Sequence, residues 1–174
     1  MATPEDLRRC AQKMKQAKKI IVLVGPGMSA ESGVSTFRGS GALWDGFFGK
    51  VSMGVFGTPA GWSWMPASAW SQYLDKFYNP IKNSKPNPGH AALVELEKAC
   101  EDLTVITENV DGYQQEAGSN PDLVFEIHGS ARKYCCIKSR HPYEDFGTKD
   151  LPKTSPLCKV EGCGRYVIFR YDYL

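Results

Sequence analysis

The residues best suited to chemistry lie in short stretches that each follow an apolar run. The first, Gly25-Pro26-Gly27-Met28-Ser29-Ala30, fits the pattern G-x-G-x-x-G/A and follows the apolar residues 20–24. Glycines at these positions allow a tight turn whose N–H groups can approach a pyrophosphate at the start of a helix. The pattern predicts a dinucleotide-binding turn, although a plain strand–turn–helix could carry the same six residues.

The second stretch, Glu108-Asn109-Val110-Asp111, follows the apolar residues 103–107. Open α/β sheets bind their ligands at the carboxyl ends of their strands. A carboxamide and a carboxylate one residue apart in that position could hold a ring that bears an amide. Asn-x-Asp by itself is also a common turn.

The third stretch ends in His128-Gly129, directly after the apolar-rich residues 123–127. An imidazole has a pKa near neutral pH, so in its neutral form it can take a proton from a hydroxyl group. A single histidine after a strand is often structural instead. The function of His128 therefore depends on the motifs around it.

The composition is that of an ordinary globular protein. The chain has 174 residues, of which 42% are hydrophobic and 23% charged, enough for one core or for one core and a small lobe. Its net charge of +2 does not favour nucleic acid or an anionic membrane as a partner, and no apolar run is long enough to span a bilayer. The first ten residues contain Glu5 and Asp6 and no apolar signal core, which predicts a cytoplasmic or nuclear protein. In such a reducing compartment the six cysteines are expected to be metal ligands or free thiols.

The elements that position these motifs can be predicted from spacing. Residues 20–24, 103–107 and 123–127 are expected to be strands, the first of them buried on both faces. Thr3 and Pro4 predict the start of a helix with a packed apolar stripe that includes Leu7 and Met14. Its many lysines and arginines indicate a solvated face, or alternatively a basic patch. Further helices are expected at 66–78 and 90–100, with His90 in a structural role.

Together the three stretches resemble the motifs of the sirtuins, the NAD-dependent protein-lysine deacylases. Residues 25–39, GPGMSAESGVSTFRG, resemble the first cofactor motif, and Glu108 to Asp111 resembles the Gln-Asn-Ile-Asp motif. Phe125-Glu126-Ile127-His128-Gly129 resembles the catalytic segment. Thr36 is similar to the class III branch, which is associated with acidic acyl groups, whereas Pro26, Ser35 and Glu108 depart from the family pattern.

The resemblance implies an α/β fold: a partial Rossmann-type parallel sheet with a small inserted helical lobe and a zinc-ribbon-like cysteine insert. We expect one incomplete domain over 1–174, with the Rossmann-like part at 1–44 and 91–132. The helical insert would occupy 45–90 and the cysteine-bearing insert 133–165. Residues 40–66, rich in Gly, Phe and Trp, are expected to form a cofactor-covering loop and an aromatic-lined cleft, or alternatively only the apolar lining of a small helical lobe.

The resemblance also implies the site residues. His128 would be the general base toward the ribose of NAD, and Asn109 and Asp111 would orient nicotinamide. The other expected cofactor contacts are Gly25, Pro26, Gly27, Ser29, Ala30, Thr36, Phe37, Arg38, Trp44, Glu108 and Val110.

Two further sets are implied by likeness to class III sirtuins. Tyr73 and Lys76 match a Tyr-x-x-Arg pair that binds the carboxylate of a succinyl- or malonyl-lysine, although a plain surface pair would have the same spacing. The thiols of Cys136, Cys158 and Cys163 would bind one zinc ion, which needs four ligands. Cys135 is poorly placed beside Cys136, so His141 is the better fourth candidate.

The expected function is NAD-dependent removal of acyl groups, preferably succinyl or malonyl, from acylated-lysine proteins. The likeness ends after Gly164 and covers about the first half to two-thirds of a sirtuin domain. The alternative is therefore a truncated, inactive module that binds NAD or proteins. A zinc-ribbon nucleic-acid binder is disfavoured because no basic surface or full ligand set is evident. The family also allows a mitochondrial location.

Overall fold

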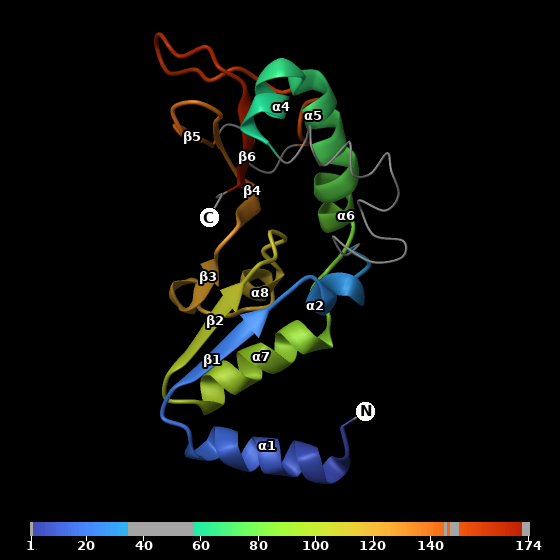
Figure 1. Cartoon of the computed structure of the whole chain (residues 1–174), viewed down its shortest axis with the longest axis vertical. Coiled ribbons are helices and arrows are strands. Elements are labelled where there is room, and N and C mark those ends of the chain that lie inside the picture. The colour runs from blue at the N-terminus through green and yellow to red at the C-terminus, as the bar shows by residue number, and fades with distance from the viewer. Residues whose placement is uncertain (1, 35–57, 145, 147–149, 172–174) are drawn as a thin grey trace.

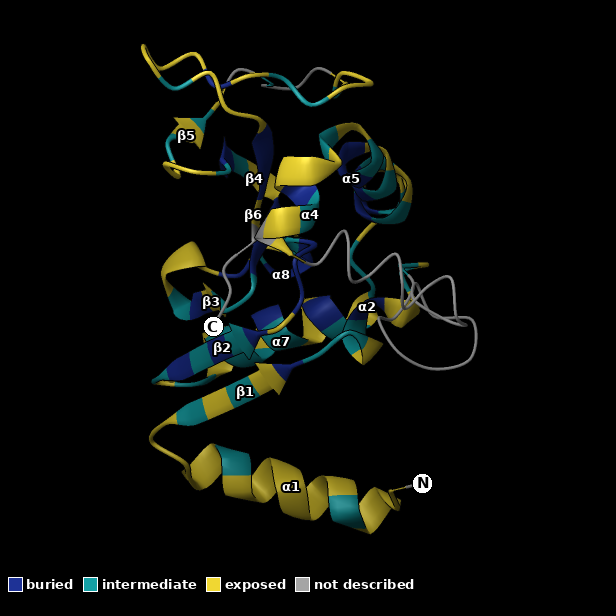
Figure 2. Ribbon diagram, turned by 45° about the horizontal axis from the view of Figure 1, so that its top comes forward, coloured by how far each residue is buried: buried dark blue, intermediate teal, exposed yellow. Residues whose placement is uncertain are grey.

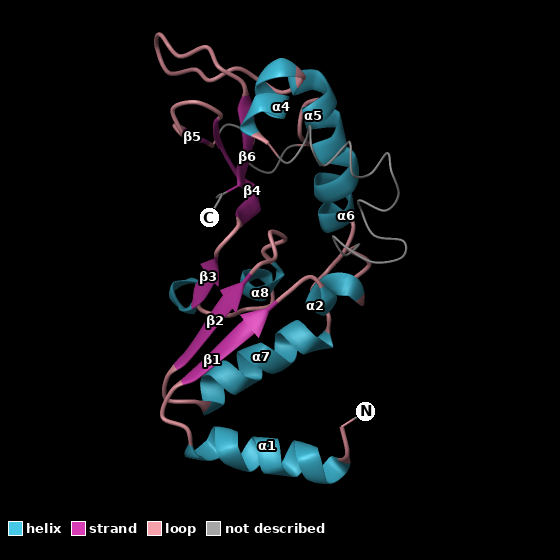
Figure 3. Cartoon of the chain, in the orientation of Figure 1, coloured by secondary structure: helices cyan, strands magenta, loops and turns pink. Residues whose placement is uncertain are grey.

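The computed structural model describes residues 2–34, 58–144, 146 and 150–171 (Figure 1). Four of the expected cofactor contacts, Thr36, Phe37, Arg38 and Trp44, lie outside these residues. The described part contains a three-stranded parallel sheet, a group of short helices and a second, antiparallel sheet (Figure 3). The α/β fold predicted from the sequence is confirmed.

The parallel sheet contains the three predicted strands. β1 (Ile20–Val24) pairs with β2 (Leu103–Thr107), and β2 pairs with β3 (Val124–Glu126). The bounds of β1 and β2 agree with the prediction. β3 is shorter than expected because a 3₁₀ turn, η2 (Pro121–Leu123), takes up its first residue and a turn begins before His128.

One face of this sheet is covered by helix α7 (Pro88–Ala99), where Val24, Leu103, Val105 and Val124 form a core with leucines of the helix. The side chains that point away from α7 remain exposed: Ile21 and Leu23 on β1 are 59% and 78% exposed, and Phe125 on β3 is 54% exposed. Figure 2 shows exposed segments alternating along β1. The prediction that β1 is buried on both faces is therefore wrong. A short apolar run is compatible both with a strand buried on two faces and with a strand that packs on one face only.

Helix α1 (Pro4–Gln16) begins as predicted, with Thr3 and Asp6 forming a reciprocal capping box. Its predicted packing is wrong, because none of its residues is buried and Leu7 is 62% exposed. In Figures 1 and 2 the helix stands apart at one end of the molecule. The spacing of apolar residues predicts which side of α1 is apolar, but it does not show whether another element packs against that side.

In the described residues from 58 on, the helical lobe contains α4 (Pro59–Trp64), α5 (Pro66–Tyr73), the π-helical turn η1 (Leu74–Tyr78) and α6 (Asn79–Lys82). The predicted helix at 66–78 is confirmed, with a widened last turn. Trp62, Trp70, Tyr73 and Phe77 form the larger hydrophobic core together with residues of the second sheet. The ring of Tyr73 stacks on that of Phe169, with 4.8 Å between their centroids.

The second sheet has the order β5-β4-β6 and is antiparallel. β4 (Gly129–Cys136) pairs with β5 (Pro142–Tyr143) and with β6 (Val167–Tyr171). This sheet was not predicted. In the described part of the chain, no helix is long and apolar enough to cross a membrane.

Candidate functional site

The first two predicted motifs meet at the carboxyl ends of β1 and β2. β1 ends at Val24, and α2 (Gly27–Ala30) follows as a single helical turn. The N–H of Glu108 donates to the carbonyl of Val24 at 2.9 Å, which extends the parallel pairing into the second motif. The sheet thus places the glycine turn next to Asn109 and Asp111.

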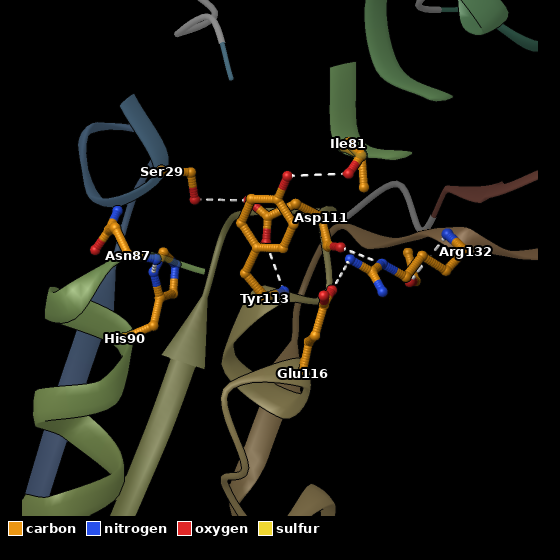
Figure 4. A network of polar contacts seen from close by, with 9 residues as sticks. Ser29, Ile81, Asn87, His90, Asp111, Tyr113, Glu116 and Arg132 are labelled. Atoms are coloured by element: carbon orange, nitrogen blue, oxygen red, sulfur yellow. Dashed lines mark hydrogen bonds and ion pairs between the residues drawn. The ribbon is translucent and has the colours of Figure 1, made fainter. Parts of the chain in front are cut away.

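A buried hydrogen-bond chain joins the two motifs, and Figure 4 shows its link between Ser29 and Asp111. The Nδ2 of Asn109 donates to the carbonyl of Gly25 and to the Oγ of Ser29, each at 3.1 Å. The Oγ of Ser29 in turn donates to the Oδ2 of Asp111 at 2.7 Å. Ser29, Asn109 and Asp111 are each at most 6% exposed, so the contacts are shielded from water.

The orientation of the Asn109 amide follows from its partners. The carbonyl of Gly25 can only accept, so the NH₂ group must face it. The Oδ1 of Asn109 then lies on the other side, where it is buried and has no hydrogen-bond partner. A buried acceptor without a donor is costly, and a ligand with an amide N–H would satisfy it. The turn therefore fits a cofactor that carries a carboxamide, as NAD does.

The remaining predicted cofactor contacts differ in exposure. Val110 is buried in the larger core, and its carbonyl accepts from the N–H of Ala131 at 2.8 Å. Gly25 and Pro26 are partly exposed, whereas Gly27, Ala30 and Glu108 are exposed. Gly25, Pro26, Gly27 and Ala30 belong to the turn itself, and Glu108 lies beside Gly25. Contact of these residues with a cofactor stays a prediction.

His128 lies in the turn between β3 and β4, where it is partly buried. Gly129, which follows it, has φ of 80°, a left-handed conformation that favours glycine. This kink redirects the chain from the parallel sheet to the antiparallel one. The role of His128 as a base stays a prediction.

The structure corrects the predicted substrate contact of Tyr73. Its side chain is 0% exposed, and its hydroxyl donates to the carbonyl of Ala131 at 2.7 Å and lies 2.9 Å from the hydroxyl of Tyr134. Burial raises the pKa of Tyr73, so the phenol stays neutral. Lys76 is partly exposed. In the Tyr-x-x-Lys pattern, Tyr73 is therefore a core residue whose ring fills the interior of the lobe, whereas Lys76 lies nearer the surface.

The predicted zinc ligands do come together. The sulfurs of Cys136, Cys158 and Cys163 and a ring nitrogen of His141 all lie within 4.8 Å of one another. The Cys136 and Cys163 sulfurs are 3.3 Å apart, and the Cys158 sulfur is 3.6 Å from Nδ1 of His141. Tetrahedral zinc with bonds of about 2.3 Å places its ligand atoms about 3.8 Å apart, so the four groups fit one ion.

The choice of His141 over Cys135 is borne out by this geometry. Cys135 is buried in the larger hydrophobic core, as expected for a residue that alternates with Cys136 along β4. A backbone hydrogen bond at Arg165 and the neighbouring Cys136 lower the pKa of Cys163 to about 6. A thiolate at neutral pH suits a zinc ligand.

Two residues that support the site were missed. Asn87 caps α7, and its Nδ2 donates to the carbonyl of Met28 at 2.7 Å and to the Oγ of Ser32 at 3.0 Å, so it ties the helix to the glycine turn. An Asn before Pro-Gly is a helix-start signal that could have indicated it. The other, Arg132 on β4, contacts the loop of Asp111, and no spacing rule signals it.

His90 is structural, as predicted. It is buried, and its Nδ1 accepts from the N–H of Asn87 at 3.2 Å within the cap of α7. Its ring meets that of Tyr113 edge-on, with centroids 5.7 Å apart. Burial lowers the pKa of His90 and so favours the neutral ring.

Comparison with known proteins identifies the family of this chain. The model of the Sir2 family matches residues 25–170, so the likeness extends six residues beyond Gly164, its predicted end. An NAD-dependent protein deacylase 2 of Pyrobaculum aerophilum is 38% identical over 154 residues, which are 88% of this chain and 57% of that protein. An NAD-dependent protein deacylase of Bacteroides thetaiotaomicron is 42% identical over 138 residues, 77% of this chain and 53% of that protein.

Solved structures agree as well. A Sir2 homologue in complex with NAD superimposes with a TM-score of 0.77 at 29% identity and covers 96% of this chain and 61% of its own. A mutant of a Sir2 homologue in complex with ADP-ribose superimposes with a TM-score of 0.79 at 30% identity. The match covers 95% of this chain and 62% of the homologue's chain. The chain therefore spans between half and two-thirds of the length of these relatives. By sequence and by fold, it belongs to the Sir2 family.

Proposed function

We propose that this protein is an NAD-dependent protein-lysine deacylase that transfers the acyl group to ADP-ribose. The observation that carries the proposal is the buried Oδ1 of Asn109, which lacks a donor and lies beside a glycine turn of the Sir2 type. The names of the relatives, which are NAD-dependent deacylases, support the same activity.

Each side chain has a distinct part in this proposal. NAD, when bound, supplies the ribose carbon that accepts the acyl oxygen as nicotinamide leaves. Asn109 accepts from the nicotinamide amide, and Ser29 and Asp111 hold the Asn109 side chain in place through the buried chain of hydrogen bonds. His128 takes a proton from a ribose hydroxyl at its neutral ring nitrogen.

The proposed zinc ion has a structural part. Cys136 lies on β4 and Cys158 and Cys163 precede β6, so an ion held by these residues and His141 would pin the two strands together. With four protein ligands no coordination position remains for a substrate.

We also propose that acidic acyl groups are preferred. The support is the sequence likeness to class III sirtuins at Thr36 and in the Cys-x4-Cys-Gly of Cys158 to Gly164. Tyr73 is not part of this proposal, because it is buried. Equal turnover of acetyl-, malonyl- and succinyl-lysine peptides would contradict the preference.

The test measures binding and turnover separately. NAD affinity is measured by calorimetry on the wild-type chain, on Asn109→Ala and on Lys98→Ala, an exposed control on α7. Asn109→Ala should weaken NAD binding at least tenfold, because a buried hydrogen bond to the ligand is lost. Lys98→Ala should bind as the wild type does.

Turnover is followed by mass spectrometry of acylated peptide and acyl-ADP-ribose. His128→Ala should keep NAD binding but lose product formation. Binding without turnover in the wild type would favour the alternative, a binding module without activity. No NAD binding by the wild type would overturn the proposed function.

A further inference from the structure

Arg132 on β4 reaches across to the loop that carries Asp111. Its Nε donates to the backbone carbonyl of Asp111 at 2.5 Å, and its guanidinium pairs with the carboxylate of Glu116 (Figure 4). The guanidinium carbon also lies 5.5 Å from the ring centroid of Tyr113. One side chain therefore contacts three residues of the segment between Asp111 and Glu116.

The loop is shaped to receive this side chain. Gly112 has φ of 70°, and a Cβ built there would lie 3.0 Å from Cδ and 3.1 Å from Nε of Arg132. Any residue larger than glycine would be strained and would displace the guanidinium. Gly112 and Arg132 thus fit together as a pair.

The contact acts directly on the geometry of Asp111. The Oδ1 of Asp111 accepts from the N–H of Tyr113 at 2.9 Å, while its Oδ2 accepts from Ser29. Its backbone carbonyl is held by Arg132, and the preceding carbonyl, of Val110, is held by the N–H of Ala131. β4 therefore fixes the backbone from which the Asp111 carboxylate projects.

We propose that Arg132 is a positioning residue that sets the affinity of this site for the nicotinamide end of NAD, by holding the carbonyl of Asp111. This inference rests on the proposed function, since it assumes that Asn109 and Asp111 face nicotinamide. Arg132 donates to the carbonyl through Nε and pairs with Glu116 through a terminal nitrogen, because its nitrogens form a rigid planar fork. A lysine keeps the charge but replaces this fork with a single nitrogen on a flexible stem.

The first test does not depend on NAD. Amide hydrogen exchange is measured on the wild-type chain of 174 residues, on Arg132→Lys and on Lys133→Gln. Lys133 is the matched control, because it is the next cation on β4 and pairs with Glu126 at 3.0 Å. Arg132→Lys should speed exchange of the Tyr113 amide about tenfold or more and leave the Val105 amide in β2 unchanged.

The second test separates the two halves of the cofactor. Arg132→Lys should weaken NAD binding about tenfold and change the affinity for ADP-ribose, which lacks nicotinamide, less than about twofold. A loss shared equally by NAD and ADP-ribose, or an unchanged Tyr113 amide, would overturn the positioning role. If the wild type binds neither ligand, the proposed function fails and with it the cofactor part of this inference, while the exchange of Tyr113 still decides whether Arg132 holds the loop.

Discussion

Ser29 is the residue on which the buried hydrogen-bond chain depends. Its hydroxyl accepts from Asn109 and donates to Asp111, and its own exposed fraction is 2%. Removal of this one oxygen would leave one N–H of Asn109 and one oxygen of Asp111 buried without a partner. Such a loss costs more than the hydrogen bonds were worth, because neither group can return to water.

We therefore predict that Ser29→Ala lowers the free energy of unfolding by about 2–4 kcal/mol. Urea denaturation followed by circular dichroism measures this change. Ser63→Ala, at an exposed position on α4, is the control and should change stability by less than about 0.5 kcal/mol. Equal stability of the two variants would show that water replaces the missing hydroxyl.

His90 makes a prediction about pH. In the unfolded chain its pKa is about 6.5, and burial lowers the pKa in the fold. Above pH 6.5 both states are neutral at this residue, so stability does not change with its titration. Below that pH the unfolded chain takes up the proton first, and the free energy of unfolding falls until the folded pKa is reached.

His90→Asn should remove this pH dependence, since the amide oxygen can still accept from the N–H of Asn87 and does not titrate. The measurement is urea denaturation of both proteins between pH 5 and 8. The difference between wild type and variant should narrow as the pH falls below about 6.5. Parallel curves would show that another group accounts for the acid sensitivity.

At the scale of elements, the Cys and His cluster joins β4 to β6. In the described part of the chain the antiparallel sheet has only these two long strands and the two-residue β5. A metal that binds the folded site and not the unfolded chain adds its binding free energy to stability. Chelation should therefore loosen this sheet before the parallel one.

The fourth ligand can be tested directly. His141→Ala should lose zinc and lower the melting temperature, whereas His141→Cys should keep about one zinc ion per chain with four thiolates. Elemental analysis after dialysis gives the zinc content, and thermal denaturation gives the melting temperature. Full zinc content in His141→Ala would assign the fourth position to another group.

Some elements could be predicted from the sequence and others could not. β1, β2 and the start of α1 follow from local signals, namely apolar runs and the cap at Thr3. The three zinc thiolates follow from the likeness to class III sirtuins, and His141 is favoured because Cys135 is adjacent to Cys136. Contacts between residues distant in the sequence could not be predicted in this way. The burial of Tyr73 and the contact of Arg132 with Asp111 depend on how strands far apart in the chain are brought together. Neither the π-helical turn nor the antiparallel sheet leaves a periodic signal of its own.

At the scale of the whole molecule, the exposed face of the parallel sheet is the most unusual feature. Ile21, Leu23 and Phe125 form an apolar surface on the side opposite α7. Exposed apolar residues on a strand at the edge of a sheet promote association between chains.

We predict that Leu23→Lys reduces self-association and leaves stability within about 0.5 kcal/mol of the wild type, because the side chain is already exposed. Sedimentation velocity over a range of concentrations measures association, and urea denaturation measures stability. Val22→Lys, on the covered face of the same strand, is the contrast and should unfold the protein. A wild-type protein that stays monomeric at every concentration would contradict the prediction that this face promotes self-association.

The parallel pairing of β1 with β2 also has a consequence during synthesis. Val24 ends β1, and Leu103 begins its partner 79 residues later, after the whole helical lobe. At about 5–20 residues per second, the ribosome needs roughly 4–16 seconds to deliver β2 after β1. Among the described residues, β2 is the strand that pairs with β1, so during that interval the five apolar residues of β1 lack this partner in the nascent chain. Chaperones that bind short apolar segments should therefore find their first target in this protein at Ile20–Val24.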